Sequence, residues 1–225
     1  MSGRSRSTCA LVSGGLDSAL LVHRLLARGQ RVLPLYLRCG LWWERAELSW
    51  LRRYLDAIRT PALAPLLVVE MPLVGVYRGH WSLTGRAIPD ARSADAAVYL
   101  PGRNVLLLTH AAIVCARRRC STIALGILKG NPFGDASPRF LTQMATCLSQ
   151  ALSHPIRIVA PLRQFTKAQL VRAAADLPLA LTFSCIRPDG RFHCGRCNKC
   201  AERQRAFRAA AVTDPTRYAY RGRRP

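Results

Sequence analysis

Short apolar runs alternate along the chain with longer segments whose apolar residues recur at helical spacing. The apolar runs lie at 9–12, 31–37, 66–69, 122–126 and 156–159. Segments with helical spacing lie at 19–26, 44–58, 105–118, 139–152, 167–175 and 201–211. Strands that alternate with helices in this way form a parallel sheet. We therefore predict an α/β fold with a five-stranded parallel sheet and helices on both of its faces.

A glycine-containing turn joins the first predicted strand to the first predicted helix. Its sequence is Ser13-Gly14-Gly15-Leu16-Asp17-Ser18. Glycines let the backbone come close to a ligand, and the free amides that open a helix attract anions. The two serines can donate hydroxyl groups, and Asp17 can hold a magnesium ion that bridges phosphate oxygens. The turn is a candidate phosphate-binding loop, although the same residue types are also common in ordinary tight turns.

The spacing within this turn separates two known phosphate motifs. A Walker loop needs a Lys-Ser or Lys-Thr pair after its glycines, and no lysine occurs before Lys129. The pattern Ser-Gly-Gly-x-Asp-Ser instead resembles the PP-loop of the N-type ATP pyrophosphatases. That resemblance implies an enzyme that cleaves ATP between its α and β phosphates, adenylates a carbonyl or carboxylate, and releases pyrophosphate and then AMP.

Size and hydropathy are those of one cytosolic domain. The 225 residues are enough for a sizeable core, and no uninterrupted apolar run approaches the roughly 20 residues of a membrane span. The short basic N-terminal stretch lacks the apolar segment of a signal peptide. We expect a single cytoplasmic domain over residues 1–225 that makes no membrane contact and has flexible ends at 1–8 and 212–225.

The chain is strongly basic, with 34 Lys and Arg residues against 12 Asp and Glu residues. Almost all of this charge is arginine, because Lys129, Lys167 and Lys199 are the only lysines. Such a surface suits nucleic acid. It equally suits ATP and an acidic substrate, and an arginine-favouring genome would also produce it. Charge alone therefore leaves RNA open as a partner.

Periodicity is lost in two stretches, 74–100 and 127–138. A loop as long as the first is usually functional or mobile in a compact domain. We interpret it as a lid over the substrate, with disorder as the alternative. Two helix starts are recognisable nearby in sequence: Asn104 is a predicted N-cap, and Thr166 with Gln169 forms a capping-box pattern.

Four of the nine cysteines are clustered near the end of the chain, at Cys185, Cys194, Cys197 and Cys200. Tetrahedral zinc favours four thiolates at such spacing, and a site with no open position is structural. An iron–sulfur cluster or a redox pair is the alternative, but ligand softness favours zinc here. A disulfide framework is not expected in a cytosolic chain. We interpret His193 as a residue that either lies beside the metal site or faces solvent, and not as a ligand.

Three motifs occur together in one known family. They are the PP-loop, the segment Leu100-Pro101-Gly102-Arg103-Asn104 and the cysteine spacing, and Ala160-Pro161-Leu162 with Lys167 fits the same pattern. On these motifs the chain resembles the QueC family of 7-cyano-7-deazaguanine synthases over about residues 9–208. The resemblance implies an adenine nucleotide α hydrolase-like fold. It also implies an ATP-dependent carbon–nitrogen ligase of the queuosine pathway, which converts 7-carboxy-7-deazaguanine and ammonia to the nitrile.

The resemblance also implies roles for particular residues. ATP, with Mg²⁺, would be bound by Val12, Ser13, Gly14, Gly15, Leu16, Asp17, Ser18, Ala19, Leu20, Leu21 and Val22, together with Gly126. One structural Zn²⁺ would be bound by Cys185, Cys194, Cys197 and Cys200. The catalytic residues would be Asp17, Ser18, Arg103 and Lys167, close to the phosphates and the activated carboxylate. A homodimer is expected as well.

Two segments depart from the family pattern, and both bear on the substrate. An Asp-Tyr-Gly-Gln-like segment is replaced by residues 38–43, and a Tyr-Pro-Asp-Cys-Arg element by residues 131–139. A paralogue that adenylates another carboxylate, on a protein, an RNA or a small molecule, is therefore an alternative.

Two further functions are to be weighed. A PP-loop tRNA-modifying enzyme such as a thiolase would need a cysteine pair outside the metal site, for example Cys39 with Cys115 or Cys120. A non-enzymatic, zinc-stabilised nucleic-acid-binding module is the other, and the intact glycine loop argues against it.

Overall fold

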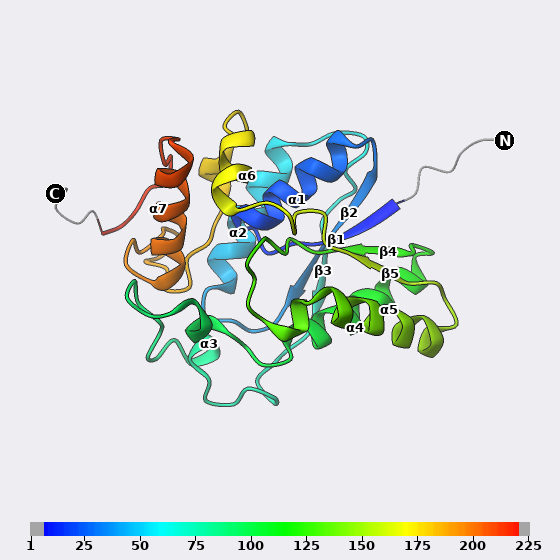
Figure 1. The fold of residues 1–225 in the computed structure, drawn as a ribbon. Coiled ribbons are helices and arrows are strands. Elements are labelled where there is room, and N and C mark those ends of the chain that lie inside the picture. The colour runs from blue at the N-terminus through cyan, green and yellow to red at the C-terminus, as the bar shows by residue number, and fades with distance from the viewer. Residues whose placement is uncertain (1–6, 221–225) are drawn as a thin grey trace.

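The computed structural model describes residues 7–220, which form a parallel sheet with helices on both faces (Figure 1). Its five strands are β1 (Ser7–Leu11), β2 (Arg31–Arg38), β3 (Leu67–Glu70), β4 (Thr122–Ala124) and β5 (Arg157–Val159). Their order is β3-β2-β1-β4-β5, and every neighbouring pair is parallel. The predicted sheet is confirmed. The chain winds outward from β1 in both directions, so the order reverses between β1 and β4, where ligands bind in such sheets.

The helices also lie where the hydrophobic pattern predicts them, except for the short α3, which falls within the aperiodic stretch at 74–100. They are α1 (Leu16–Ala27), α2 (Glu44–Ala57), α3 (Trp81–Thr84), α4 (Arg103–Arg117), α5 (Pro138–Leu152), α6 (Lys167–Ala173) and α7 (Asn198–Ala210). The Thr166–Gln169 capping box is present at the start of α6. Within residues 7–220, no helix combines the length and the apolar character needed to cross a bilayer.

Alternation along β1 explains why both faces of the sheet are covered. Successive side chains of a strand point to opposite faces. Cys9 packs in one buried cluster with α4 and α5, and Ala10 packs in the other with α1, α2, α6 and α7. The central strand is thus covered on both faces, which accounts for its apolar run at 9–12.

The start of α4 differs from the prediction. Gly102, in the left-handed region at φ +70°, precedes the helix, and Asn104 lies within its first turn instead of capping it. Asp135 holds Asn104 from outside the helix, because its Oδ2 and its carbonyl accept hydrogen bonds from the Asn104 backbone and side-chain amides at 3.1 Å each. The contact joins α4 to the loop that follows β4.

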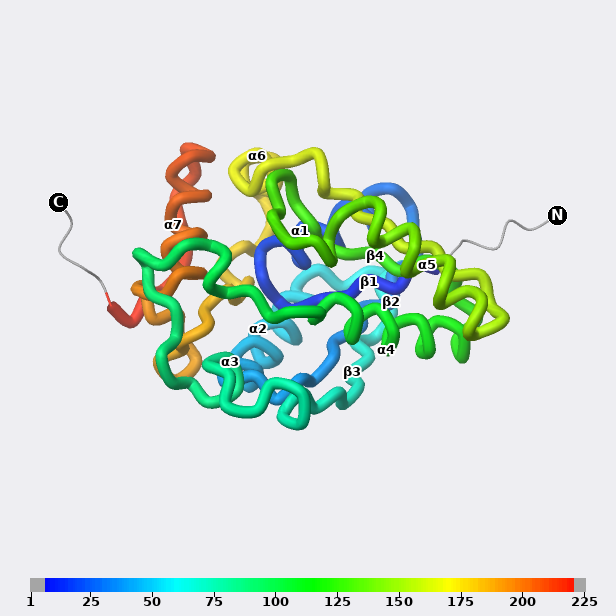
Figure 2. Tube along the Cα trace, turned by 60° about the horizontal axis from the view of Figure 1, so that its bottom comes forward, coloured from blue at the N-terminus to red at the C-terminus, as the bar shows by residue number. Residues whose placement is uncertain are grey.

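The long aperiodic stretch at 74–100 has a defined path, which argues against disorder. Figure 2 shows it running from the end of β3, through α3, to the start of α7 and back to α4. There the Asn198 backbone amide donates to Pro89 O at 3.0 Å, and its side chain donates to Ser93 O at 2.9 Å. The stretch is therefore packed against the cysteine-rich segment.

The described residues at both ends of the chain pack against the rest of the fold. Ser7 and Thr8 belong to β1. Beyond α7, Asp214 lies 3.8 Å from the buried Arg203 guanidinium, and the Tyr220 amide donates to Cys194 O at 3.2 Å. The expected flexible tail thus packs against the metal-binding segment up to residue 220. Residues 1–6 and 221–225 of the predicted flexible ends lie outside the described part.

Candidate active site and metal centre

The turn between β1 and α1 has a conformation that requires glycine. Gly14 has φ +81°, and a Cβ placed on it would lie 3.2 Å from both the Glu47 carbonyl oxygen and the Leu51 Cβ. Gly15 caps α1 in an extended conformation with no side-chain hydrogen bond. Backbone amides at the start of α1 therefore face the turn without a competing side chain, as a helix start that binds an anion requires.

The two serines of the turn hold it closed. The Ser13 amide donates to Ser18 Oγ at 3.0 Å, and the two hydroxyl oxygens are 2.9 Å apart. Gly126 packs on the same turn from the end of β4, since a Cβ there would lie 3.0 Å from the Asp17 carbonyl oxygen. These contacts bring the predicted residues Ser13, Asp17, Ser18 and Gly126 together.

A chain of charged side chains leads from the turn to α7. Lys167 Nζ lies 3.3 Å from Asp17 Oδ2 and also contacts Glu202 Oε1, while Lys199 Nζ lies 2.7 Å from Glu202 Oε2. Burial opposes the charge of Glu202, but the two lysines outweigh it and lower its pKa to about 2. The predicted Lys167 is thus beside Asp17, and α7 contributes two charged groups that the motif comparison missed.

These contacts engage only one of the two carboxylate oxygens of Asp17. Its Oδ1 is buried and accepts no hydrogen bond from residues 7–220. Burial raises the pKa of Asp17, while Lys167 acts in the opposite direction. An unpaired carboxylate oxygen beside an anion-binding turn fits the place of a Mg²⁺ ion held with a phosphate.

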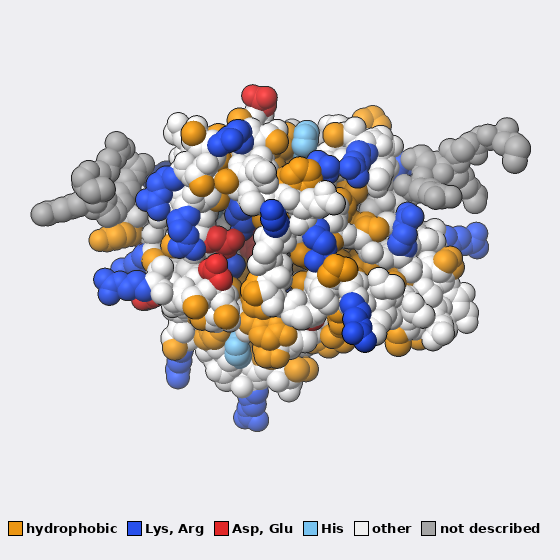
Figure 3. Space-filling model, viewed as in Figure 1, with side chains coloured by type: hydrophobic (Ala, Val, Ile, Leu, Met, Phe, Trp, Pro, Cys, Tyr) orange, Lys and Arg blue, Asp and Glu red, His pale blue; other side chains and the backbone are white. Residues whose placement is uncertain are grey.

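Two adjoining cavities open beside the turn. The first, of about 280 Å³, lies at the carboxyl ends of β1, β2 and β4, and its polar lining comprises Ser13, Asp17, Ser18, Tyr36, Glu47, Arg103, Asn104, Asn131 and Asp135. The second, of about 260 Å³, reaches toward α7 and is lined by Lys167, Lys199 and Glu202 among others. Figure 3 shows acidic side chains at a hollow in the middle of this face, with Lys and Arg side chains around it. Ser13, Asp17, Glu47 and Arg103 line both cavities.

The two segments that depart from the family pattern, 38–43 and 131–139, both contribute residues to the first cavity. Arg38 forms ion pairs with Glu44 at 3.1 Å and with Glu70 at 2.8 Å, whereas Leu41 lines the first cavity. From the segment after β4, Phe133 stacks on Tyr99 with ring centres 4.6 Å apart, and both rings line that cavity. The cavity therefore combines an apolar, aromatic wall with a polar floor.

Glu47 and Tyr36 are cavity residues that the sequence motifs did not reveal. Glu47 lies in the first turn of α2 and is buried together with Leu48 and Leu51. A signal existed, because acidic residues at apolar-face positions of an amphipathic helix are unusual. Only the fold shows that this carboxylate reaches the PP-loop.

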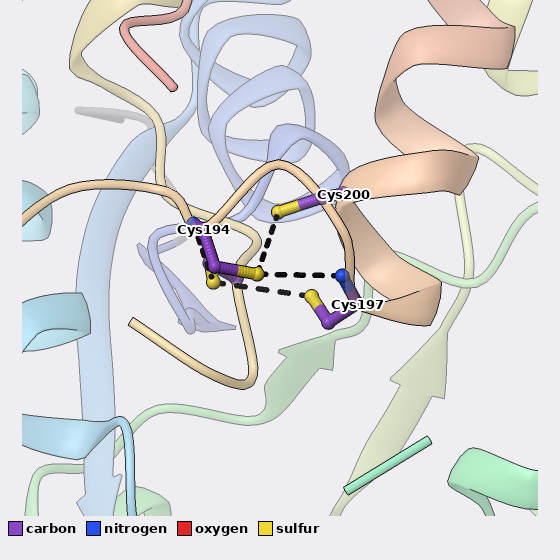
Figure 4. Close-up of side chains that lie close together, drawn as sticks. Cys194, Cys197 and Cys200 are labelled. Atoms are coloured by element: carbon purple, nitrogen blue, oxygen red, sulfur yellow. Dashed lines mark hydrogen bonds between the residues drawn. The ribbon is translucent and has the colours of Figure 1, made fainter. Parts of the chain in front are cut away.

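The four clustered cysteines converge as predicted. All are buried, and their sulfur atoms lie within 4.8 Å of one another. Figure 4 shows Cys194, Cys197 and Cys200 turned toward a common centre, and the Cys197 amide donates to Cys194 Sγ at 3.3 Å. Four convergent sulfurs with amide donors match the ligand set of a structural zinc site.

His193 lies outside this sulfur cluster. It is buried and accepts a hydrogen bond from the Ser184 amide through Nε2 at 3.1 Å. Burial, and then the Arg203 charge, lower the pKa of His193 to about 3. It is thus a neutral packing residue beside the cluster, which is one of the two expected placements, and it does not face solvent.

Cys39 does not meet Cys115 or Cys120, the pairing that a thiolase would need, whereas Cys115 and Cys120 lie beside each other. Cys120 donates to Ser7 O, at the start of β1, whereas Cys39 follows the end of β2. Ser7 pairs with Arg31 in the parallel register, so the two thiols lie at opposite ends of the sheet. Burial raises the pKa of Cys39 to about 11, which disfavours a reactive thiolate.

These features define the class of protein. A glycine loop at the reversal point of a β3-β2-β1-β4-β5 parallel sheet is the architecture of the PP-loop enzymes. Two solved structures share the fold: a 4-thiouridine synthetase in complex with RNA and ATP (TM-score 0.51, 13% identity, 93% of this chain and 51% of that chain) and a predicted tRNA methyltransferase subunit from Methanocaldococcus jannaschii (TM-score 0.50, 16% identity, 76% and 74%).

Within this class the chain belongs to the QueC family. Residues 7–211 match the family described as "Queuosine biosynthesis protein QueC". The chain is 34% identical to the 7-cyano-7-deazaguanine synthase of Paracoccus denitrificans, covering 94% of this chain and 92% of that protein. It is 32% identical to that of Methanothrix thermoacetophila, covering 95% and 98%. The protein is therefore an enzyme of the ATP-dependent ligase type.

Proposed function

We propose that the protein converts 7-carboxy-7-deazaguanine and ammonia to 7-cyano-7-deazaguanine at the expense of ATP. The observation that carries this proposal is the meeting of two cavities at the PP-loop, with Ser13, Asp17 and Arg103 on their shared wall. One cavity would take the nucleotide and the other the acid, so that the α phosphate and the carboxylate meet at the loop. The stacked rings of Tyr99 and Phe133 suit a planar heterocycle.

The charged groups suit adenylation of a carboxylate. A carboxylate is a poor electrophile, and attack on the α phosphate gives it AMP as a leaving group. Charge that develops on the phosphates is stabilised by fixed amides and cations. Here these would be the amides at the start of α1, with Lys167 and Arg103. Bound Mg²⁺ would supply further charge neutralisation, held by Asp17.

Two activations in sequence would produce the nitrile. Ammonia attacks the acyl adenylate and gives the amide with release of AMP. A second ATP would activate the amide oxygen in the same way, and loss of the nitrogen-bound protons with a second AMP would leave the nitrile. Each activation releases one pyrophosphate.

Zinc at the four cysteines would organise the second cavity. Cys197 immediately precedes α7 and Cys200 lies in its first turn, on either side of Lys199 and close to Glu202. A metal bound there would fix the start of α7 and hold these two side chains beside Lys167. We propose one structural Zn²⁺ per chain. The family resemblance extends the proposal to a homodimer, which light scattering would test.

The test is nucleotide release in the presence of the acid. Incubation with ATP, Mg²⁺, ammonium and 7-carboxy-7-deazaguanine should give AMP and pyrophosphate, at a rate that depends on the acid. Formation of ADP instead would exclude this chemistry. Mass spectrometry of the product should show the nitrile.

A second candidate is adenylation of a different carboxylate, and the rebuilt segment at 38–43 favours it. Leu41 is the residue of this segment that borders the first cavity, and Arg38 is held outside by Glu44 and Glu70. A substrate less polar on that side would fit. Tight ATP binding without any acid-dependent AMP release from 7-carboxy-7-deazaguanine would support this candidate over the first.

A further inference from the structure

We infer that Glu47 is the catalytic base of the reaction and takes a proton from the ammonium ion that supplies the nucleophile. The inference rests on the proposed function, because it concerns the step after adenylation. It is carried by the position of the carboxylate on the wall of both cavities, by its neutral hydrogen-bond donors, and by the absence of an ion pair to it within residues 7–220.

Glu47 lies where the activated carboxylate has to be attacked. Its carbonyl oxygen packs against Gly14 of the PP-loop. Its side chain borders both cavities, together with Ser13 and Arg103. The residue is only 7% exposed, so the carboxylate faces the cavities and not bulk solvent. A group at this wall lies next to whatever is bound at the loop from either side.

A second buried glutamate on the same helix shows what a purely structural carboxylate looks like here. Glu44 Oε2 accepts hydrogen bonds from the Cys39 amide at 2.5 Å and the Gly40 amide at 2.9 Å, and its Oε1 pairs with Arg38 at 3.1 Å. Those contacts fix the loop after β2. Glu47 holds no loop in this way: it accepts a hydrogen bond from the Tyr36 hydroxyl to Oε2 at 2.7 Å, and the Trp43 side chain is a second donor beside it. Both donors are neutral, and the carboxylate borders the two cavities.

The surroundings of Glu47 suit proton transfer near neutral pH. Burial raises the pKa of Glu47 to about 7, opposed by the Tyr36 hydrogen bond, the Arg103 charge and the Trp43 hydrogen bond. The titratable and charged groups that face it are Tyr36 of β2, Cys39 in the following loop, Glu44 of its own helix and Arg103 of α4. Burial also raises the pKa of Tyr36, so that this hydroxyl remains a donor. A base works best when its pKa is close to the working pH.

The proton balance of amide formation gives such a base a defined task. Ammonium has four N–H bonds and the amide nitrogen keeps two, so two protons leave. The Glu47 carboxylate takes the first and frees the nitrogen lone pair, which forms the C–N bond as the carbonyl electrons move to oxygen. The tetrahedral adduct loses the second proton to solvent. The returning electron pair then expels AMP with the electrons of the C–O bond.

The decisive variant is Glu47→Gln, which keeps the size of the side chain and an oxygen that can accept from Tyr36. Adenylation, measured as acid-dependent exchange of pyrophosphate into ATP, should stay within about twofold of wild type. Ammonium-dependent amide and nitrile formation should fall by about 100-fold or more, the usual effect of losing a general base. The matched control is Glu44→Gln, which should change both steps by the same factor.

A nucleophile that is uncharged at neutral pH provides the second readout. Hydroxylamine needs no base, so Glu47→Gln should form the hydroxamate at close to the wild-type rate. The pH profiles should also differ. Wild-type amide formation should level off above about pH 7, whereas the rate of the variant should keep rising in proportion to free ammonia.

Two outcomes would overturn the role of Glu47. One is unchanged ammonium-dependent activity in Glu47→Gln. The other is an equal loss with ammonium and hydroxylamine, which would make the residue a structural one. Failure of wild-type protein to exchange pyrophosphate with 7-carboxy-7-deazaguanine present is a different result, because it would reject the proposed substrate and not the base.

Discussion

Gly126→Ala is the sharpest test of how closely β4 must approach the PP-loop. The new Cβ would lie 3.0 Å from the Asp17 carbonyl oxygen and 3.1 Å from its carbonyl carbon. These are backbone atoms at the start of α1, so no flexible side chain can move aside. Since φ of Gly126 is not positive, alanine meets no conformational penalty of its own. The effect is therefore purely steric.

The size of this effect follows from the required displacement. Ordinary contacts begin at about 3.4 Å, so Asp17 or β4 must retreat by a few tenths of an ångström. Overpacking of this kind typically costs about 1–3 kcal/mol. If the free protein keeps the strain, the melting temperature falls by about 2–4 °C per kcal/mol. If Asp17 moves to relieve it, ATP binding weakens instead, by about tenfold per 1.4 kcal/mol.

Calorimetric titration with a non-hydrolysable ATP analogue and thermal melts measure the two parts separately. The matched control is Gly75→Ala, because Gly75 also lacks a positive φ and a Cβ there meets no atom within 4 Å. The control should bind and melt like wild type. If Gly126→Ala were equally silent in both assays, the close approach of β4 to the loop would not constrain the site, and this account of Gly126 would be wrong.

Three further predictions concern the carboxylates and the metal. Asp17→Ala should abolish acid-dependent AMP release while the circular dichroism spectrum stays that of wild type, because Asp17 is proposed to hold Mg²⁺ at the phosphates; full activity would remove it from the site. Metal analysis should find about one zinc per chain, and Cys197→Ser should lower the melting temperature, since a structural zinc contributes folding energy; a metal-free protein that melts like wild type would refute the site. Burial raises the pKa of Glu47 from 4.5 to about 7, so the folded state holds this proton more tightly than the unfolded state. The free energy of unfolding therefore falls as pH rises from 4.5 to 7, by at most about 3.4 kcal/mol at 1.36 kcal/mol per pH unit. Glu47→Gln should therefore melt higher than wild type at pH 8 and alike at pH 4; equal melting temperatures at both would show that the carboxyl titrates as in water.

The sequence was a good guide wherever local pattern decides structure. Strand positions follow from short apolar runs and helix positions from apolar residues at helical spacing. The residues of the PP-loop and the four clustered cysteines are close in sequence, so their spacing is visible without a fold. Asn104 is an instructive miss. Its type predicts an N-cap, but Asp135, 31 residues away, holds it inside the first turn of α4. A contact of that range has no local signature.

The sequence by itself therefore determined the α/β class, the parallel sheet, the glycine loop and the four-thiolate cluster. Only the tertiary structure decided which distant groups share the site. It places Lys199 and Glu202 of α7 beside Lys167 and Asp17, and it brings Glu47 to the wall of both cavities. The physical reason is that each helix or strand is specified by the pattern of its own sequence. Which side chains come together at the carboxyl edge of the sheet depends instead on strand order and packing. Charge and burial at that edge, and hence the chemistry, arise only after folding.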